Sequence, residues 1–163
     1  RNSGRRIDRS EAFSILERAE EAGFVLQPQN SRSPDFICCC CGDCCHVLRA
    51  YKKLPRPAEH FCAPCIAVFD MERCTGCGRC ADRCGMNAIR VDGKSVVLDE
   101  WRCLGCGACV GSCTRSAISL RARDKQPTVP LNQTTLYMRI LRERFGIRGL
   151  LKLAARILTG RKL

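Results

Sequence analysis

The sequence contains two copies of one cysteine-rich pattern, placed 29 residues apart. Both copies read D-x₃-C-x₂-C-G-x-C-x₃-C-x₃-A-I; the first runs from Asp70 to Ile89 and the second from Asp99 to Ile118. Eight of the 16 cysteines of the chain lie in these copies, four in each. Repetition at a fixed distance indicates that one local structure is built twice. Whatever the cysteines do in one copy, they are therefore expected to do in the other.

The composition indicates that side-chain packing alone does not hold this chain together. Hydrophobic residues make up 45% of the 163 residues, but this figure counts the cysteines, and without them the fraction is about 35%. An ordinary globular domain is about 45–50% apolar. The remaining stabilisation is expected from disulfides or from metal centres.

The spacing of the cysteines favours iron–sulfur clusters. Three cysteines in the order C-x₂-C-x₂-C, with glycines among them, allow a tight loop to surround one inorganic cube and to point backbone N–H groups at its sulfurs. The fourth cysteine opens a short helix and, in the two-cluster arrangement, ligates the other cluster. The predicted ligands are therefore Cys74, Cys77, Cys80 and Cys113 for the first [4Fe–4S] cluster, and Cys103, Cys106, Cys109 and Cys84 for the second.

The residues between and after the cysteines predict short strands. A β-rich run, a turn containing Gly93 and a second β-rich run predict a hairpin over residues 88–98. Residues 117–120 are expected to form a further strand. Loop, short helix and strand, repeated once, predict a small pseudo-twofold α+β unit.

Residues 70–122 resemble the bacterial-type dicluster ferredoxin family, whose domains bind two [4Fe–4S] clusters and transfer electrons. The family usually carries proline after the fourth cysteine of each motif, whereas Gly85 and Thr114 stand there in this chain. The resemblance implies a ferredoxin-like fold and electron transfer for about a third of the chain. A disulfide scaffold or a pair of zinc knuckles is the alternative, but neither requires glycine-interleaved triplets or two interlocked quartets.

The other eight cysteines lie before the repeat, and six of them fall between residues 38 and 45. Adjacent cysteines do not easily bond to each other, so this stretch favours a metal over disulfides. One reading is a third [4Fe–4S] cluster on a C-x₂-C-x₂-C triplet with a fourth ligand from further along the chain. The other is a zinc site of the form C-x₂-C-x₁₇-C-x₂-C. We favour the third [4Fe–4S] cluster, because a zinc site would use only four of these eight cysteines. The candidate ligands of this third centre are Cys38, Cys41, Cys44, Cys45, Cys62 and Cys65.

Flanking segments are expected to be helical. Ser10 is a candidate cap for a helix from about Glu11 to Ala22, with Gly23 as its stop. A second helix is expected over residues 44–54. These patterns predict four parts: an N-terminal helical segment (1–34), a Cys-rich metal-binding module (35–69), the dicluster domain (70–122), and a basic linker with an amphipathic tail (123–163).

Most of the positive charge lies in the tail. Residues 121–163 contain 11 basic and 2 acidic side chains, and so account for +9 of the formal charge of +12. Arg144, Arg148, Lys152 and Arg156 recur every four residues and so lie on one helical face. Such a segment can dock on an anionic membrane surface or an acidic partner, or remain a solvated helix. It contains no known nucleic-acid-binding module, so nucleic acid is not expected as a partner.

Together these features predict an electron-transfer iron–sulfur protein that acts with redox partners as a subunit of a larger complex. The alternative is a redox enzyme whose chemistry occurs at the centre of residues 38–45, fed by the two ferredoxin clusters; a zinc-stabilised adaptor would leave the repeat unexplained. No Ser/His/Asp set, phosphate loop or nicotinamide fingerprint accompanies the cysteines. No apolar run long enough for a membrane span is present and no signal peptide is visible. We expect the cytoplasm of an anaerobe. Attachment of the tail to a membrane surface stays open beside docking on an acidic partner.

Overall fold

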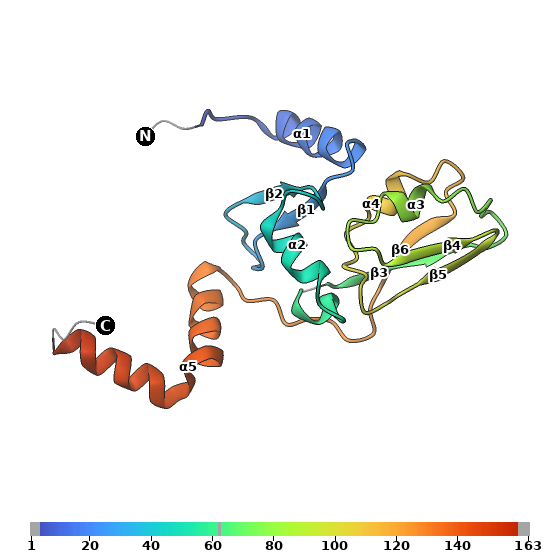
Figure 1. The fold of residues 1–163 in the computed structure, drawn as a ribbon. Helices are drawn as coiled ribbons and strands as arrows, with labels where there is room; N and C mark the ends of the chain where they lie inside the picture. The colour runs from blue at the N-terminus through green and yellow to red at the C-terminus, as the bar shows by residue number, and fades with distance from the viewer. Residues whose placement is uncertain (1–3, 62, 160–163) are drawn as a thin grey trace. The chain divides into compact units, whose positions relative to one another are not determined.

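The computed structural model describes residues 4–61 and 63–159, except for the side chains of residues 148 and 150–158. The chain forms two compact units (Figure 1). Unit 1 comprises Arg1–Gln27 and Ile37–Thr128, and unit 2 comprises Pro28–Phe36 and Val129–Leu163.

The described residues form helices of 4 to 26 residues and three two-stranded sheets, so the fold is α+β. The sheets pair β1 with β2, β3 with β6, and β4 with β5. In chain order the elements are α1 (Arg9–Glu21), β1 (Val25–Pro28), β2 (Ile37–Cys40), α2 (His46–Lys52), the 3₁₀ turn η1 (Pro57–His60), β3 (Cys65–Phe69), α3 (Arg79–Asp82), β4 (Ile89–Asp92), β5 (Ser95–Leu98), α4 (Ala108–Gly111), β6 (Ile118–Ala122) and α5 (Gln133–Leu158).

The predicted hairpin is confirmed. Strands β4 and β5 pair antiparallel with Ile89 opposite Leu98, and Gly93 in the turn has φ +57°, which a glycine adopts without strain. The strand expected over residues 117–120 is confirmed as β6. It pairs antiparallel with β3, where Phe69 lies opposite Ile118. Strand β3 falls within the predicted Cys-rich module (35–69), where the sequence does not predict a strand.

The two copies of the repeat make equivalent contacts with each other. Strand β3 precedes the first cysteine triplet and β5 precedes the second. The N–H of Asp70 donates to the carbonyl of Ala117 at 2.8 Å, and the N–H of Asp99 donates to the carbonyl of Ala88 at 2.8 Å. Asp70 and Asp99 occupy the same position in their copies, and so do Ala88 and Ala117. The aspartate of each copy therefore bonds to the alanine of the other copy.

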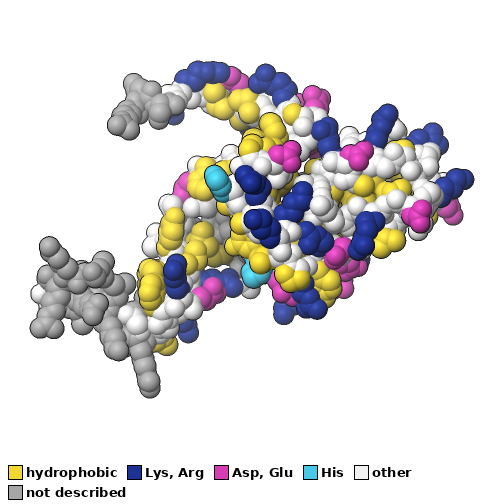
Figure 2. Space-filling view, in the orientation of Figure 1, with side chains coloured by type: hydrophobic (Ala, Val, Ile, Leu, Met, Phe, Trp, Pro, Cys, Tyr) yellow, Lys and Arg dark blue, Asp and Glu magenta, His cyan; other side chains and the backbone are white. Residues whose placement is uncertain are grey.

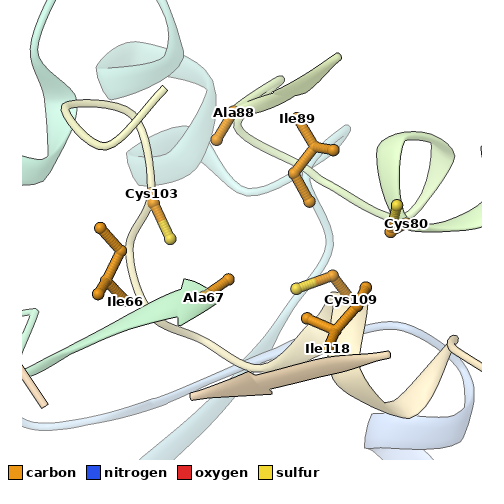
Figure 3. Close-up of a cluster of buried hydrophobic side chains, with 8 residues drawn as sticks. All are labelled: Ile66, Ala67, Cys80, Ala88, Ile89, Cys103, Cys109 and Ile118. Carbon is orange, nitrogen blue, oxygen red and sulfur yellow. The ribbon is translucent and has the colours of Figure 1, made fainter. Parts of the chain in front are cut away.

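A thin core lies between these elements. Figure 3 shows sulfur atoms among the aliphatic side chains of this core. Three of its eight buried members are cysteines of the repeat. The members are Ile66, Ala67, Cys80, Ala88, Ile89, Cys103, Cys109 and Ile118.

A second core joins the Cys-rich segment to the repeat within unit 1. Its buried members are Val25 of β1, Leu48 of α2 and Met86 of the loop after α3. The guanidinium of Arg102 fixes the same junction by donating hydrogen bonds to three carbonyl oxygens: that of Lys52 at 2.7 Å, that of Leu54 at 3.0 Å and that of Met86 at 2.9 Å.

The expected helices are present with different limits. Asp8 caps α1, because its carboxylate accepts the N–H of Glu11 at 2.7 Å, so the expectation of a Ser10 cap is wrong. Gly23 has φ +85° and ends the helix, as expected. The second helix, α2, is shorter than the expected 44–54.

The tail is helical, but α5 is broken at Gly146, which has φ 64° and ψ 176°. The basic stripe cannot be followed along this helix, because the side chains of Arg148, Lys152 and Arg156 lie outside the described residues. Within the described part of the chain, no helix has the length and apolar character needed to span a bilayer. On the face of unit 1 seen in Figure 2, basic and acidic side chains are interspersed.

Candidate metal centres

The first cavity is ringed by cysteines from both copies of the repeat. Cys74 and Cys77 come from the loop before α3, Cys80 lies in α3 itself, and Cys113 follows α4. Phe69, Val91 and Val96 contribute apolar wall. The four cysteines are those predicted to serve together: Cys74, Cys77, Cys80 and Cys113.

The second cavity has the reciprocal composition. Cys84 comes from the first copy, and its walls include Met86, Leu98 and Leu104. The remaining cysteines come from the second copy and complete the other predicted quartet: Cys103, Cys106 and Cys109. The structure thus brings the residues of each predicted quartet to one cavity.

Glycines shape the loops that line these cavities. Gly78 and Gly107 immediately precede α3 and α4, and both have φ +80°. A Cβ atom at Gly76 would overlap the carbonyl oxygen of Gly93, and one at Gly105 would overlap that of Cys65. The loops therefore need glycine both for their left-handed backbone and for close packing.

The fourth cysteine of each copy is oriented by the backbone. The N–H of Ala88 donates to Sγ of Cys84 at 3.3 Å, and the N–H of Ala117 donates to Sγ of Cys113 at 3.3 Å. Hydrogen bonds to sulfur orient a ligating thiolate and adjust the redox potential of a bound cluster.

Burial and mutual repulsion oppose ionisation of the thiols when no cation is present. Burial, with a smaller contribution from the neighbouring thiolates of Cys106, Cys103 and Cys84, raises the pKa of Cys109 to about 12. Burial also raises the pKa of Cys80. The pKa of the exposed Cys77 is lowered, chiefly because its sulfur accepts the backbone N–H of Arg79. Since ligands bind as thiolates, a cationic iron core supplies the charge that these sites lack, and its binding releases protons.

Four thiols, apolar walls and backbone N–H donors at each cavity fit an iron–sulfur cube. When bound, such a cluster takes up and gives back one electron.

The Cys-rich segment is organised differently. Cys38, Cys39 and Cys40 lie in β2, and Cys45 precedes α2. Burial raises the pKa of Cys40 to about 11, whereas hydrogen bonds from the backbone N–H of Leu48 lower the pKa of Cys45. Cys65 begins β3, and the candidate ligand Cys62 lies outside the described residues.

Cys41 and Cys44 are joined by a disulfide, with their Cα atoms 6.0 Å apart. Adjacent cysteines bond poorly, and for that reason the sequence favours a metal over disulfides. This pair, however, is separated by two residues, and its Cα distance lies in the usual range for a disulfide. A sulfur in a disulfide is not a thiolate and does not bind a metal as one. The structure therefore does not support Cys41 and Cys44 as ligands of a third metal centre. Within residues 4–61 and 63–159, neither in this segment nor at the two cavities are three His, Cys, Asp or Glu side chains grouped closely enough to hold a single metal ion.

Two arginines support the second cavity, and the sequence does not predict either of them. Arg102 precedes Cys103 and anchors the loop to the end of α2. Arg123 donates to the carbonyls of Glu100 at 3.0 Å and Cys103 at 2.9 Å. The repeat does not distinguish Arg102, because the corresponding residue of the first copy is Arg73, which forms an exposed ion pair with Asp70. Arg123 lies after the second copy, which ends at Ile118.

Removing iron should abolish cooperative unfolding of unit 1. Three of the eight residues of the first core are cysteines, so the apolar remainder provides little burial once the cavities lose their contents. Circular dichroism during anaerobic heating, before and after chelation under reducing conditions, measures this. An unchanged midpoint would show that the fold does not depend on metal.

Residues 66–114 match the family model described as the 4Fe–4S dicluster domain. The match begins within β3 and includes all eight cysteines of the repeat. No curated protein matches the chain.

Proposed function

From the presence of a 4Fe–4S dicluster domain at residues 66–114, we propose that this chain transfers single electrons through two [4Fe–4S] clusters, one in each cavity. The observation that carries the proposal is that each cavity is ringed by four cysteines, three from one copy of the repeat and one from the other. The proposed ligands are Cys74, Cys77, Cys80 and Cys113 in the first cavity and Cys84, Cys103, Cys106 and Cys109 in the second.

The reciprocal contacts support a pseudo-twofold, ferredoxin-like arrangement of this domain. Strand β3 pairs with β6 as β5 pairs with β4, and the Asp70–Ala117 and Asp99–Ala88 hydrogen bonds correspond. This arrangement explains why a cluster would draw its fourth ligand from the opposite copy.

The surrounding residues set the conditions for electron transfer. Aliphatic side chains exclude water from the cavities, while N–H donors at Cys84 and Cys113 stabilise negative charge on sulfur. Cys77 and Cys106 are the exposed members of their quartets. Electrons would enter and leave near these two thiolates, where the protein covering is thinnest.

We propose that redox partners dock through unit 2, which would make the chain a subunit of a larger complex. The described part of α5 exposes Met138, Ile140, Phe145 and Ile147 beside its basic residues. An apolar and basic surface of this kind suits an acidic protein partner or an anionic lipid surface.

Metal analysis and electron paramagnetic resonance test the electron-transfer proposal. The anaerobically purified chain should contain about eight irons and about eight inorganic sulfides. After reduction its clusters should show mutual spin coupling, since both belong to one small domain. A protein that contains zinc alone, or that shows no signal after reduction, would contradict the proposal. About twelve irons would instead indicate a third cluster in the Cys-rich segment.

A further inference from the structure

We propose that Cys41 and Cys44 form a reversible dithiol–disulfide couple that exchanges electrons with the cluster in the second cavity. This inference rests on the proposed function, because the clusters supply the electrons. It assigns a redox role to the part of the Cys-rich segment that the dicluster domain does not include.

The backbone places this couple against the second cavity. Gly42, between the two cysteines, contacts Gly85, which follows Cys84 of the second quartet. A Cβ atom at Gly42 would lie 3.0 Å from Cα of Gly85 and 3.4 Å from its carbonyl oxygen. Two residues without side chains thus let the disulfide-bearing loop touch the chain next to a cluster ligand.

The junction is packed on both sides of this contact. Cys40 and Cys45, which flank the couple, pack against the second core together with Cys84 and Leu104. The three hydrogen bonds of Arg102 fix the end of α2 to the loop that carries Cys103. The distance between the couple and the cluster is therefore set by the fold of unit 1.

The electron count matches the number of clusters. Each reduced cluster gives up one electron, and the two electrons with two protons from solvent convert the Cys41–Cys44 disulfide into two thiols. The couple would thus collect two electrons, delivered one at a time by the clusters, in a single dithiol. Cys44 is exposed, and exposed disulfides have less negative potentials than structural ones, so electrons from low-potential clusters flow toward it.

The surroundings suggest that the dithiol acts on a negatively charged disulfide. Gly42 and Asp43 line an open hollow with three basic residues, Arg49, Lys52 and Lys53. The Cys44 thiolate would attack one substrate sulfur and release the first thiol. Cys44 is then bonded to the second substrate sulfur in a mixed disulfide. The Cys41 thiolate would attack Sγ of Cys44, release the second substrate thiol and restore the Cys41–Cys44 disulfide.

An anaerobic titration of the intact, cluster-containing chain with titanium(III) citrate tests the couple. The first electron equivalents, about two per chain, should leave the visible absorbance of the clusters unchanged, because they reduce the disulfide. The next equivalents, about two, should bleach the clusters. Alkylation and peptide mass analysis should show Cys41 and Cys44 blocked before the titration and modified after the first stage.

The Cys44→Ser variant should lose the first stage and bleach from the first equivalent, with iron and sulfide unchanged. The Cys39→Ser variant is the matched control, since Cys39 is an exposed free cysteine in the same segment, and it should retain both stages. Bleaching of the wild type from the first equivalent would overturn the couple. Loss of iron or zinc on Cys44→Ser would also overturn it, by showing that Cys44 is a metal ligand.

Failure of the couple and failure of the proposed function give different results. A chain without iron and sulfide contradicts the electron-transfer proposal, whereas a chain with both clusters but no first stage contradicts only the couple. For the substrate class, the reduced chain is mixed with bis(nitrobenzoate) disulfide, which is anionic, or with cystamine, which is cationic. The ratio of the two exchange rates should fall several-fold in a Lys52→Gln/Lys53→Gln variant. An unchanged ratio would overturn the assignment of an anionic substrate.

Discussion

A chain with both Cys77 and Cys113 changed to alanine should retain one intact cluster, whereas a chain lacking Cys77 and Cys84 should retain none. Cys77 and Cys113 line the same cavity, while Cys84 lines the other. The first double variant therefore removes two ligands from one site, and the second removes one ligand from each.

The two variants are matched, because each removes two cysteines and differs only in which fourth cysteine is lost. With one intact cube, the Cys77→Ala/Cys113→Ala chain should contain about four irons bound as [4Fe–4S]. It should also lose the spin coupling between clusters while keeping a signal from one of them. The Cys77→Ala/Cys84→Ala chain should show no intact [4Fe–4S] signal.

The reverse result would show that each fourth cysteine binds the cluster of its own loop. Equal damage in both variants would show that neither cluster survives alone. Iron and sulfide analysis with electron paramagnetic resonance distinguishes these results from one another.

Changing Gly76 to alanine should lower the temperature at which the cluster absorbance is lost by considerably more than changing Gly78 to alanine. Both glycines have a left-handed backbone, with φ +72° and φ +80°. Only at Gly76 would the added Cβ overlap a backbone atom, the carbonyl oxygen of Gly93; at Gly78 nothing lies within 4 Å.

The difference between the two variants isolates the overlap from the backbone strain. A side chain in the left-handed region costs about 1–2 kcal/mol, which lowers the midpoint by roughly 4–16 °C in a small domain. Overlap with a backbone atom that cannot move away adds about 1–3 kcal/mol. Absorbance during anaerobic heating at a fixed scan rate provides the measurement, because cluster loss is irreversible. Equal midpoints would mean that the hairpin turn is not packed on the cysteine loop.

The sequence predicted the parts of the structure that depend on local chemistry. The hairpin over β4 and β5 follows from two β-rich runs on either side of a turn that contains Gly93, and α1 ends before Gly23, because glycine readily adopts the left-handed backbone found there. The membership of each cysteine quartet followed from spacing, and the structure brings each quartet to one cavity.

The features that the sequence did not reveal depend on contacts between distant segments. Strand β3 forms because β6 lies beside it, and its own residues include an ordinary apolar run after Cys65. Arg102 looks like Arg73 in the repeat, and only the position of α2 gives it three carbonyl partners. The Cys41–Cys44 pairing competes with metal binding by the same residues, and spacing alone does not separate the two chemistries.

The reciprocal composition of the two cavities has a consequence for how such a domain arises. A half-length ancestor with one copy of the repeat would place only three cysteines around its own cavity, with its fourth directed to the cavity of a neighbour. It would complete its sites by associating with an identical molecule. Joining two such genes end to end would preserve every contact of that dimer, and thereafter allow the two halves to diverge independently.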